Sequence, residues 1–225
     1  MPQMATVFAN APPAHVPARC ILAGRYVRLE PLSAAHAGDL FAAISQPPQP
    51  SRFDYLSEAP PADAAALACW IEARSGQADP LFSAVVEQTS GRAVGRQALM
   101  RITPEHGVIE IGNILWSDAM ARTRLATEAL YLMAAHVFED LGYRRLEWKC
   151  NAQNAASRRA ALRFGFRYEG IFLQHMWLKG ANRDTAWFAM LDVQWPVLRE
   201  RYAAWLQPEN FTNDGRQLRS LGISA

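Results

Sequence analysis

The stretch LGYRRLEWKCNAQNAASRRAALRFGFRYEG, residues 141–170, has the pattern of a strand, a helix and a second strand. Residues 145–150 predict the first strand, and residues 166–169 begin the second. Between them, Asn154 is a preferred N-cap residue, and Gly165 stands where glycine commonly ends a helix. The stretch therefore predicts a strand–helix–strand unit in the second half of the chain.

Upstream of this unit, the chain predicts a long helix preceded by a three-stranded meander. The helix covers residues 123–141 and is followed by Gly142, a favoured residue after a helix C-terminus. Two apolar runs, 81–87 and 93–102, are joined by turn residues and give a hairpin signal. Residues 108–116 add the third strand.

The first part of the chain predicts a strand and two helices separated by a proline-rich loop. The strand begins at Arg25, Ser33 opens the first helix, and Asp63 opens the second. The loop at 46–60 is long enough to line a cleft.

The chain ends in a predicted hairpin, 171–178 with 185–193, and a helix beyond Pro196. The order of elements predicts a mixed α/β fold, with one sheet and helices on both faces. The predicted division of the chain is an extended N-terminal arm at 1–22, one domain at 23–206 and a loosely held C-terminal tail at 207–225.

The composition is that of an ordinary globular protein. Half of the 225 residues are apolar, and 23 basic residues nearly balance 21 acidic ones, whereas nucleic-acid-binding proteins more often concentrate a basic excess. Cys20, Cys69 and Cys150 form no CxxC pair and have no histidine at zinc-ligand spacing, so we expect reduced thiols and no metal. Because no apolar run could span a bilayer and no signal-peptide pattern occurs, we predict a cytoplasmic protein without a membrane partner.

Two predicted helices begin with arginine residues, although the helix dipole disfavours each cation there by about 0.3 to 1 kcal/mol. A bound anion such as phosphate would offset this cost for Arg122 and Arg124. An equally weighted alternative pairs Arg124 with Glu128 one turn on. Arg158 repeats the pattern after Asn154, so the two helix starts could hold one polyanionic ligand, although such arginines more often belong to a solvated face.

Residues 122–129, RTRLATEA, together with the stretch 141–170, resemble the coenzyme-A-binding half of the GNAT acyltransferase superfamily. The resemblance extends over about residues 24–195 and is closest to the ribosomal-protein N-terminal acetyltransferase-like group. It implies a splayed mixed sheet of about seven strands. It also implies acetyl-CoA as co-substrate, with its pantetheine between strands 109–115 and 146–150.

In this family the coenzyme pyrophosphate is held by a loop of pattern Gln/Arg-x-x-Gly-x-Gly/Ala, which corresponds here to residues 121–126. Ala121 replaces the first residue of that pattern and Arg124 replaces the central glycine, which would permit close backbone approach to phosphate. The guanidinium groups of Arg122 and Arg124 are expected to substitute electrostatically. The expected coenzyme contacts are Asn113, Ile114, Leu115, Arg122, Thr123, Arg124, Leu125, Ala126, Asn154 and Arg158.

Transfer from a thioester to an amine needs a neutral amine, a polarised carbonyl and a proton for the departing thiolate. Glu110 is either a base that faces a cleft or a solvated residue on the outer face of its strand, and the resemblance places a base on this strand. The resemblance also implies that backbone amides at 113–115 polarise the carbonyl if the strand bulges, and that Ser157 protonates the thiolate. From the residues alone, Ser157 is equally well a second capping residue of its helix.

Two other reactive side chains are expected to be structural. His136 lies beside Leu132 and Val137 on the long helix, and this pattern favours a packed histidine over a catalytic one. Cys150 ends a strand without an adjacent histidine, which favours a small core residue over a nucleophile.

The sequence thus predicts an N-acetyltransferase in which a primary amine attacks acetyl-CoA directly in a ternary complex. The acceptor would be a small-molecule amine or a peptide N-terminus. The residues expected to contact it are Phe53, Tyr55, Lys179, Asn182, Arg183 and Asp184. The main alternative is a non-catalytic module of the same fold that binds acyl-CoA or another anion. A nucleic-acid partner is the weaker third hypothesis, and a homodimer is left open.

Overall fold

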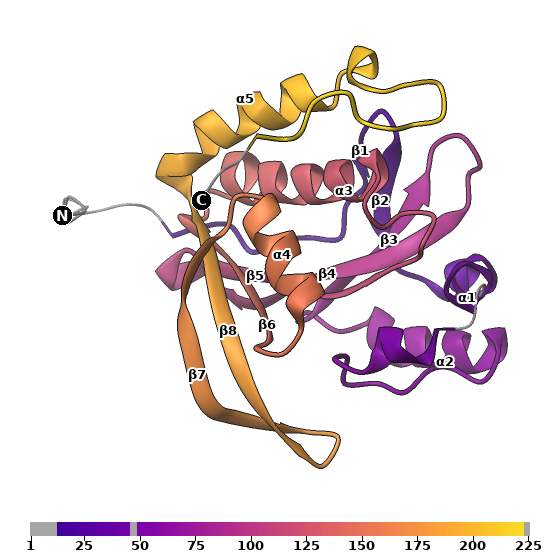
Figure 1. Cartoon of the computed structure of the whole chain (residues 1–225). Helices are drawn as coiled ribbons and strands as arrows, with labels where there is room; N and C mark the ends of the chain where they lie inside the picture. Colours follow the sequence, from indigo (N-terminus) through magenta and orange to yellow (C-terminus); the bar gives the residue numbers. More distant parts are fainter. Residues whose placement is uncertain (1–12, 46–48, 223–225) are drawn as a thin grey trace.

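The computed structural model describes residues 13–45 and 49–222. In this part of the chain, one eight-stranded sheet has the order β1-β2-β3-β4-β5-β6-β8-β7 (Figure 1). Every neighbouring pair is antiparallel except β5 and β6, which are parallel. The strands are β1 (Leu22–Ala23), β2 (Val27–Pro31), β3 (Leu81–Glu87), β4 (Ala93–Thr103), β5 (Val108–Trp116), β6 (Arg145–Asn151), β7 (Arg167–Leu178) and β8 (Ala181–Leu191).

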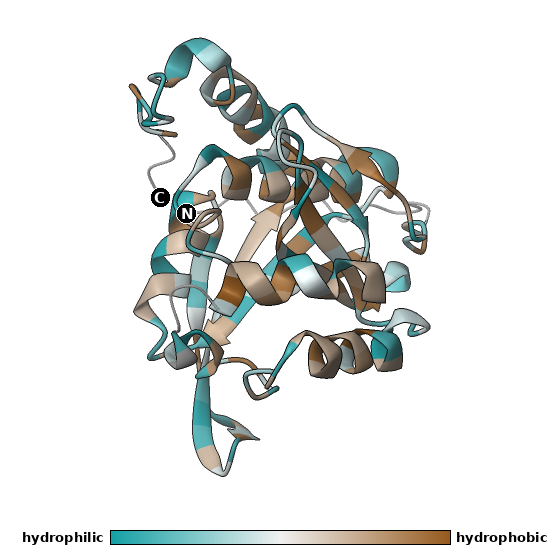
Figure 2. Cartoon of the chain, turned by 90° about the vertical axis from the view of Figure 1, so that its right-hand side faces the viewer, coloured by the Kyte–Doolittle hydropathy of each residue, from teal (hydrophilic) through white to brown (hydrophobic). Residues whose placement is uncertain are grey.

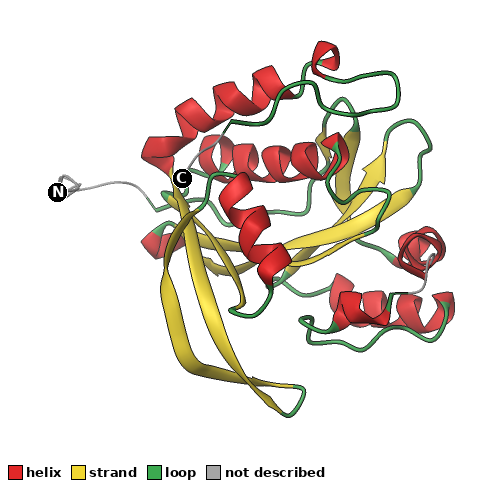
Figure 3. Cartoon of the chain, viewed as in Figure 1, coloured by secondary structure: helices red, strands yellow, loops and turns green. Residues whose placement is uncertain are grey.

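Helices cover both faces of the sheet (Figure 3). On one face, the pair α1 (Ala37–Ser45) and α2 (Ala64–Ser75) packs in a core with Phe82 of β3. The opposite face is covered by α3 (Arg124–Ala135), α4 (Ala155–Arg163) and α5 (Trp195–Trp205). The hydrophobic residues gather on the central strands between these layers (Figure 2). The predicted mixed α/β class is therefore confirmed.

Local capping explains why the predicted helices begin where they do. The side chain of Asp63 accepts the backbone N–H of Ala66, and that of Asn154 accepts the N–H of Ser157. These bonds satisfy donors that have no partner inside the helix. The helix starts inferred from Asp63 and Asn154 are confirmed.

The structure corrects the assignment of the strands at the end of the sheet. The separate strands expected at 166–169 and 171–178 are one strand, β7, which shifts its register near Gly170 and again between Phe172 and Met176. Such irregularities bend a strand without ending it. Besides β1, which has only two residues, the described sheet has the expected seven strands.

The central parallel pair opens after a short contact. Strands β5 and β6 pair from Val108 with Arg145 to Glu110 with Glu147, and no further pairing between them occurs in the described structure. β5 also bulges against β4, where Ala98 opposes Gly112 and the register shifts before Leu115. The sheet is thus splayed, as the family resemblance implied.

The two ends of the described chain pack against the domain. The backbone N–H of His15 donates to the carbonyl of Leu141 at 2.8 Å. At the other end Asn210 and Leu221 are buried, which corrects the expectation of a loosely held tail for residues 207–222. The remainder of the predicted arm, 1–12, and of the tail, 223–225, lies outside the described residues. No helix in the described ranges is long and apolar enough to cross a membrane.

Candidate active site

The opening between β5 and β6 begins at a bulge centred on Asn113. This residue takes a left-handed conformation with φ 49°, and its carbonyl accepts a hydrogen bond from Nη1 of Arg96 at 2.8 Å. Arg96 is buried and also forms an ion pair with Glu58. This support fixes the bulge at 113–115, along the edge of β5 that leaves β6.

A tight turn leads from β5 into the N-terminus of α3. Oγ1 of Thr123 donates to the carbonyl of Met120 at 2.7 Å and accepts the backbone N–H of Leu125 at 3.1 Å. Arg122 adopts φ 65° just before this cap. The amides of Arg124 and Ala126 belong to the first turn, where no intrahelical acceptor exists, and the Thr123 hydroxyl caps neither of them. They are therefore available to an anion.

Arg124 has partners that the sequence did not reveal. Its guanidinium lies 4.4 Å from the ring centre of Tyr26 and 5.4 Å from that of Phe211. The alternative pairing with Glu128 is wrong in the described structure, because the Glu128 carboxylate instead accepts three backbone N–H groups at 2.6 to 2.9 Å. Those donors are Arg25, Tyr26 and Val27. Arg124 thus joins α3 to β2 and to the C-terminal segment.

The start of α4 places Ser157 against β6. Asn154 caps the backbone N–H of Ser157, whereas the Ser157 hydroxyl accepts the indole N–H of Trp148 at 2.9 Å. The hydroxyl is therefore not the second cap that the sequence allowed. Burial raises the pKa of the nearby Cys150 thiol, in keeping with the predicted core role of this cysteine. Arg158 lies over the Tyr168 ring and donates to the carbonyl of Ala152.

Glu110 lies on the opposite face of the sheet in a buried charge cluster. Its neighbours Ile109 and Ile111 pack in the α3 core, so strand alternation directs Glu110 to the other side. The Nζ of Lys149 lies 2.9 Å from Glu110 and 2.5 Å from Glu147. Only 4% of Glu110 is exposed, so the alternative of a solvated outer residue is wrong. Burial raises the pKa of Glu110 despite the attraction of Lys149 and Arg101.

Two further basic side chains lie near this cluster on β7 and β8. Nε of Arg183 donates to Oγ1 of Thr185 at 3.2 Å, and the ring of His175 contacts the same oxygen at 2.9 Å. Burial lowers the pKa of Arg183. Burial also lowers the pKa of His175, and the positive charges of Arg101, Arg183 and Lys149 lower it further. Within the described residues, no carboxylate lies within 4 Å of the Arg183 guanidinium. Lys149 and His175 were not anticipated from the sequence. Lys149 pairs in register with Trp187 of β8, a relationship that only the fold reveals.

The loop around Arg52 and Phe53 contacts elements on both sides of the opening. Arg52 pairs with Asp118 after β5 at 2.9 Å, and Lys179 at the β7–β8 turn donates to the carbonyl of Phe53 at 2.8 Å. The bond between Lys179 and Phe53 joins this loop to the turn of the final hairpin. Phe53, an expected acceptor contact, is buried. Two of the other expected acceptor contacts, Asn182 and Asp184, bond to one another on β8, and Asp184 also accepts the backbone N–H of Gln174.

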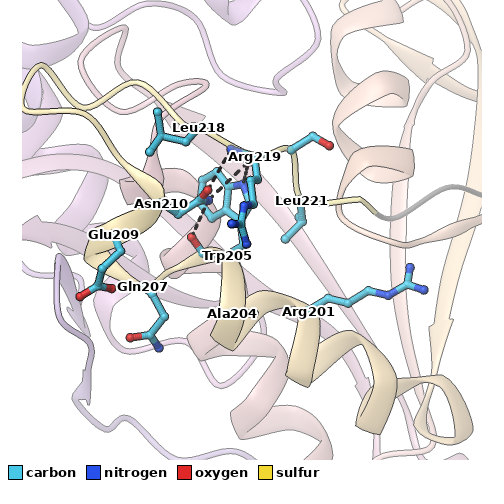
Figure 4. A pocket seen from close by; sticks show the side chains of 10 residues that line it. Arg201, Ala204, Trp205, Gln207, Glu209, Asn210, Leu218, Arg219 and Leu221 are labelled. Carbon is cyan, nitrogen blue, oxygen red and sulfur yellow. Dashed lines mark hydrogen bonds between the residues drawn. The ribbon is translucent and has the colours of Figure 1, made fainter.

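A separate cavity of about 530 Å³ lies between α5 and the C-terminal segment (Figure 4). Trp205 and Asn210 form part of its lining. The indole N–H of Trp205 donates to the carbonyl of Arg219, and the side-chain amide of Asn210 donates to the carbonyl of Trp205. None of the residues around Glu110 or Ser157 lines this cavity. It is therefore distinct from the opening between β5 and β6. Among the described residues, no cluster of His, Cys, Asp or Glu side chains is placed to hold one metal ion.

A sheet splayed between two parallel strands, with a helix N-terminus at the opening, is the architecture of a GNAT-type transferase domain. The model of the acetyltransferase (GNAT) domain family matches residues 27–167. A GCN5-related N-acetyltransferase from Brucella melitensis is 54% identical, with coverage of 94% of this chain and 96% of that chain and a TM-score of 0.91. The chain belongs to the GNAT acetyltransferase family.

Two more solved structures extend the comparison. A GNAT-family protein from Chromobacterium violaceum ATCC 12472 is 37% identical, covering 87% of this chain and 98% of that chain, with a TM-score of 0.78. A ribosomal-protein-S5-alanine acetyltransferase from Vibrio fischeri shares the fold at 12% identity, with coverage of 78% and 98% and a TM-score of 0.60. No match was found among curated proteins.

Proposed function

We propose that this protein is an N-acetyltransferase that moves the acetyl group of acetyl-CoA to a primary amine by direct attack in a ternary complex. The observation that carries this proposal is the splayed opening with Glu110 on one face of the sheet and Ser157 on the other. An amine and a thioester that meet at the opening would have a base on one side and a hydroxyl donor on the other.

The residues on the donor side fit acetyl-CoA. The free edge of β5 at Asn113, Ile114 and Leu115 offers backbone groups to the amides of pantetheine. The first turn of α3 offers uncapped amides to the pyrophosphate. The proposed coenzyme contacts there are Arg122, Thr123, Leu125 and Ala126, with Asn154 and Arg158 on the α4 side. We assign Arg124 mainly to holding this helix start against Tyr26.

The proposed chemistry follows from the environments of the two side chains. Glu110 accepts a proton from the acceptor ammonium, and its raised pKa makes it a better base near neutral pH. The amine nitrogen then bonds to the acetyl carbon as the carbon–sulfur bond breaks. Ser157, held by Trp148, gives its proton to the departing sulfur and regains one from the nitrogen of the new amide.

The charge around Glu110 favours an acceptor that carries an anionic group as well as its amine. Lys149 and Arg101 are matched by Glu110 and Glu147, whereas the half-buried Arg183 has no carboxylate partner in the described structure. A polyamine would add positive charge to this cluster. A free amino acid or a peptide with a nearby carboxylate would instead supply the missing anion.

The test combines binding with product detection. Acetyl-CoA is first titrated into the protein by calorimetry, and a panel of amines is then incubated with both and analysed by mass spectrometry. We expect acetylated amine to form and no acetyl-enzyme to accumulate when acetyl-CoA is added alone. An accumulating acetyl-enzyme would contradict direct transfer, whereas binding without any product across the panel would favour the non-catalytic module. A cytoplasmic location and a homodimer stay predictions.

A further inference from the structure

Cys20, His136 and Asp140 come together far from the opening between β5 and β6. Sγ of Cys20 lies 3.8 Å from Nε2 of His136, and Nδ1 of His136 lies 2.7 Å from Oδ2 of Asp140. Cys20 precedes β1, whereas the other two residues begin and end a short π-helical turn, His136–Asp140. Such turns inside helices are frequent at functional sites.

The contacts of the imidazole ring determine its tautomer. Nδ1, which faces the Asp140 carboxylate at 2.7 Å, carries the ring proton and donates a hydrogen bond to that carboxylate. In the neutral ring Nε2 then has a lone pair directed toward the thiol. Only 13% of the His136 side chain is exposed, which restrains the ring, while Cys20 is exposed and accessible. Because Cys20 and Asp140 contact opposite nitrogens of the ring, the three side chains do not converge on one metal ion.

The surroundings of Cys20 keep its thiol protonated until a base removes the proton. Burial is the main cause that raises the pKa of this thiol, and the negative charge of Asp140 raises it further. His136 is the base within reach. The thiol borders a small hollow lined by Arg19, Leu22, Leu99 and Met133, so an approaching reagent meets both apolar surface and a cation.

We propose that Cys20 is a nucleophilic thiol, assisted by His136 and by the positioning residue Asp140, that reacts with small-molecule disulfides at a site separate from acetyl transfer. His136 lies at the C-terminal end of α3, about 18 Å along the helix from the proposed phosphate site. Neither the cysteine nor the histidine belongs to the machinery around Glu110.

The reaction is a thiol–disulfide exchange in which the disulfide is the oxidant. The Cys20 proton passes to Nε2 of His136 as Sγ attacks one sulfur of the disulfide, and the sulfur–sulfur bond breaks. The departing thiolate then takes the proton from His136. The products are a mixed disulfide on Cys20 and one free thiol.

The chain supplies a matched control, because Cys69 is also exposed and lies on α2. The native protein is mixed with 5,5′-dithiobis(2-nitrobenzoic acid), and thiol release is followed in Cys69→Ser, where Cys20 reacts, and in Cys20→Ser, where Cys69 reacts. Mass spectrometry identifies the labelled residue. We expect Cys20 to react roughly tenfold faster or more, within the usual reach of a positioned base.

Removal of the base provides the decisive comparison. His136→Asn in the Cys69→Ser background is expected to bring the Cys20 rate near that of Cys69, and Asp140→Asn to lower it partly. In the Cys20→Ser background the same substitutions should leave the Cys69 rate unchanged, which separates loss of the base from unfolding. If His136→Asn unfolds the chain, the exposed Asp140→Asn variant carries the test. Equal rates for the two cysteines, or a Cys20 rate unaffected in a folded variant, would overturn the proposal.

Discussion

Trp148 of β6 donates its indole N–H to the Ser157 hydroxyl of α4 at 2.9 Å, which ties the strand to the helix beside the splayed opening. Because the bond uses a lone pair of the hydroxyl, the hydroxyl still has its own proton to donate. Asn154 caps the helix independently. The relationship therefore makes Trp148 a positioning residue for the proposed proton donor.

Trp148→Phe keeps an aromatic ring but removes this donor. We expect kcat to fall by up to about tenfold with little change in KM, because one hydrogen bond contributes about 0.5–1.5 kcal/mol. Steady-state kinetics with an acceptor found in the amine panel measures both constants. Adding Trp148→Phe to Ser157→Ala should cost little more than Ser157→Ala alone. Additive losses would mean that Trp148 does not act through Ser157.

Glu110→Gln removes the proposed base while conserving size. We expect kcat to fall by about 100-fold, in the range for a general base, with acetyl-CoA affinity unchanged by calorimetry. A base must be ionised to act, and burial raises the pKa of Glu110, so activity should decline as pH falls through a value above the ordinary range of glutamate. If the acid limb of the pH–rate profile is the same in Glu110→Gln as in the parent, another group is the base.

Arg183→Ala tests the proposed anionic group of the acceptor. We expect KM for an amino acid or peptide acceptor with a free carboxylate to rise roughly tenfold, which corresponds to the loss of about 1.4 kcal/mol of binding. The amide of the same acceptor has no carboxylate to lose, and its KM should already be high in the parent and should not rise further. Equal losses for the acid and its amide would contradict a direct contact.

Arg122→Ala and Arg124→Ala separate coenzyme binding from the stability of the helix start. We expect Arg122→Ala to weaken acetyl-CoA binding more, as measured by calorimetry. Arg124→Ala should instead lower the free energy of unfolding by about 1 kcal/mol, because its guanidinium packs on the Tyr26 and Phe211 rings. Urea titration of both variants gives the second quantity. A larger loss of acetyl-CoA affinity in Arg124→Ala than in Arg122→Ala would mean that Arg124 binds the coenzyme phosphate.

Local sequence patterns were enough to predict most of the helices and strands. Strand β5, the capped starts of α2 and α4, and the α/β class follow from local patterns of a few neighbouring residues, such as Asp63 accepting from Ala66. The family resemblance directed attention to Glu110 and Ser157. Both signals are carried by residues close together along the chain.

Contacts between side chains far apart in the sequence depend on how the whole chain packs. The contact of Arg124 with Tyr26 and Phe211 depends on how three segments pack, and no spacing rule encodes it. The approach of Cys20 to His136 joins residues 116 positions apart. Local propensity is set by a residue and its neighbours, whereas such pairs depend on sheet register and on the path of the whole chain.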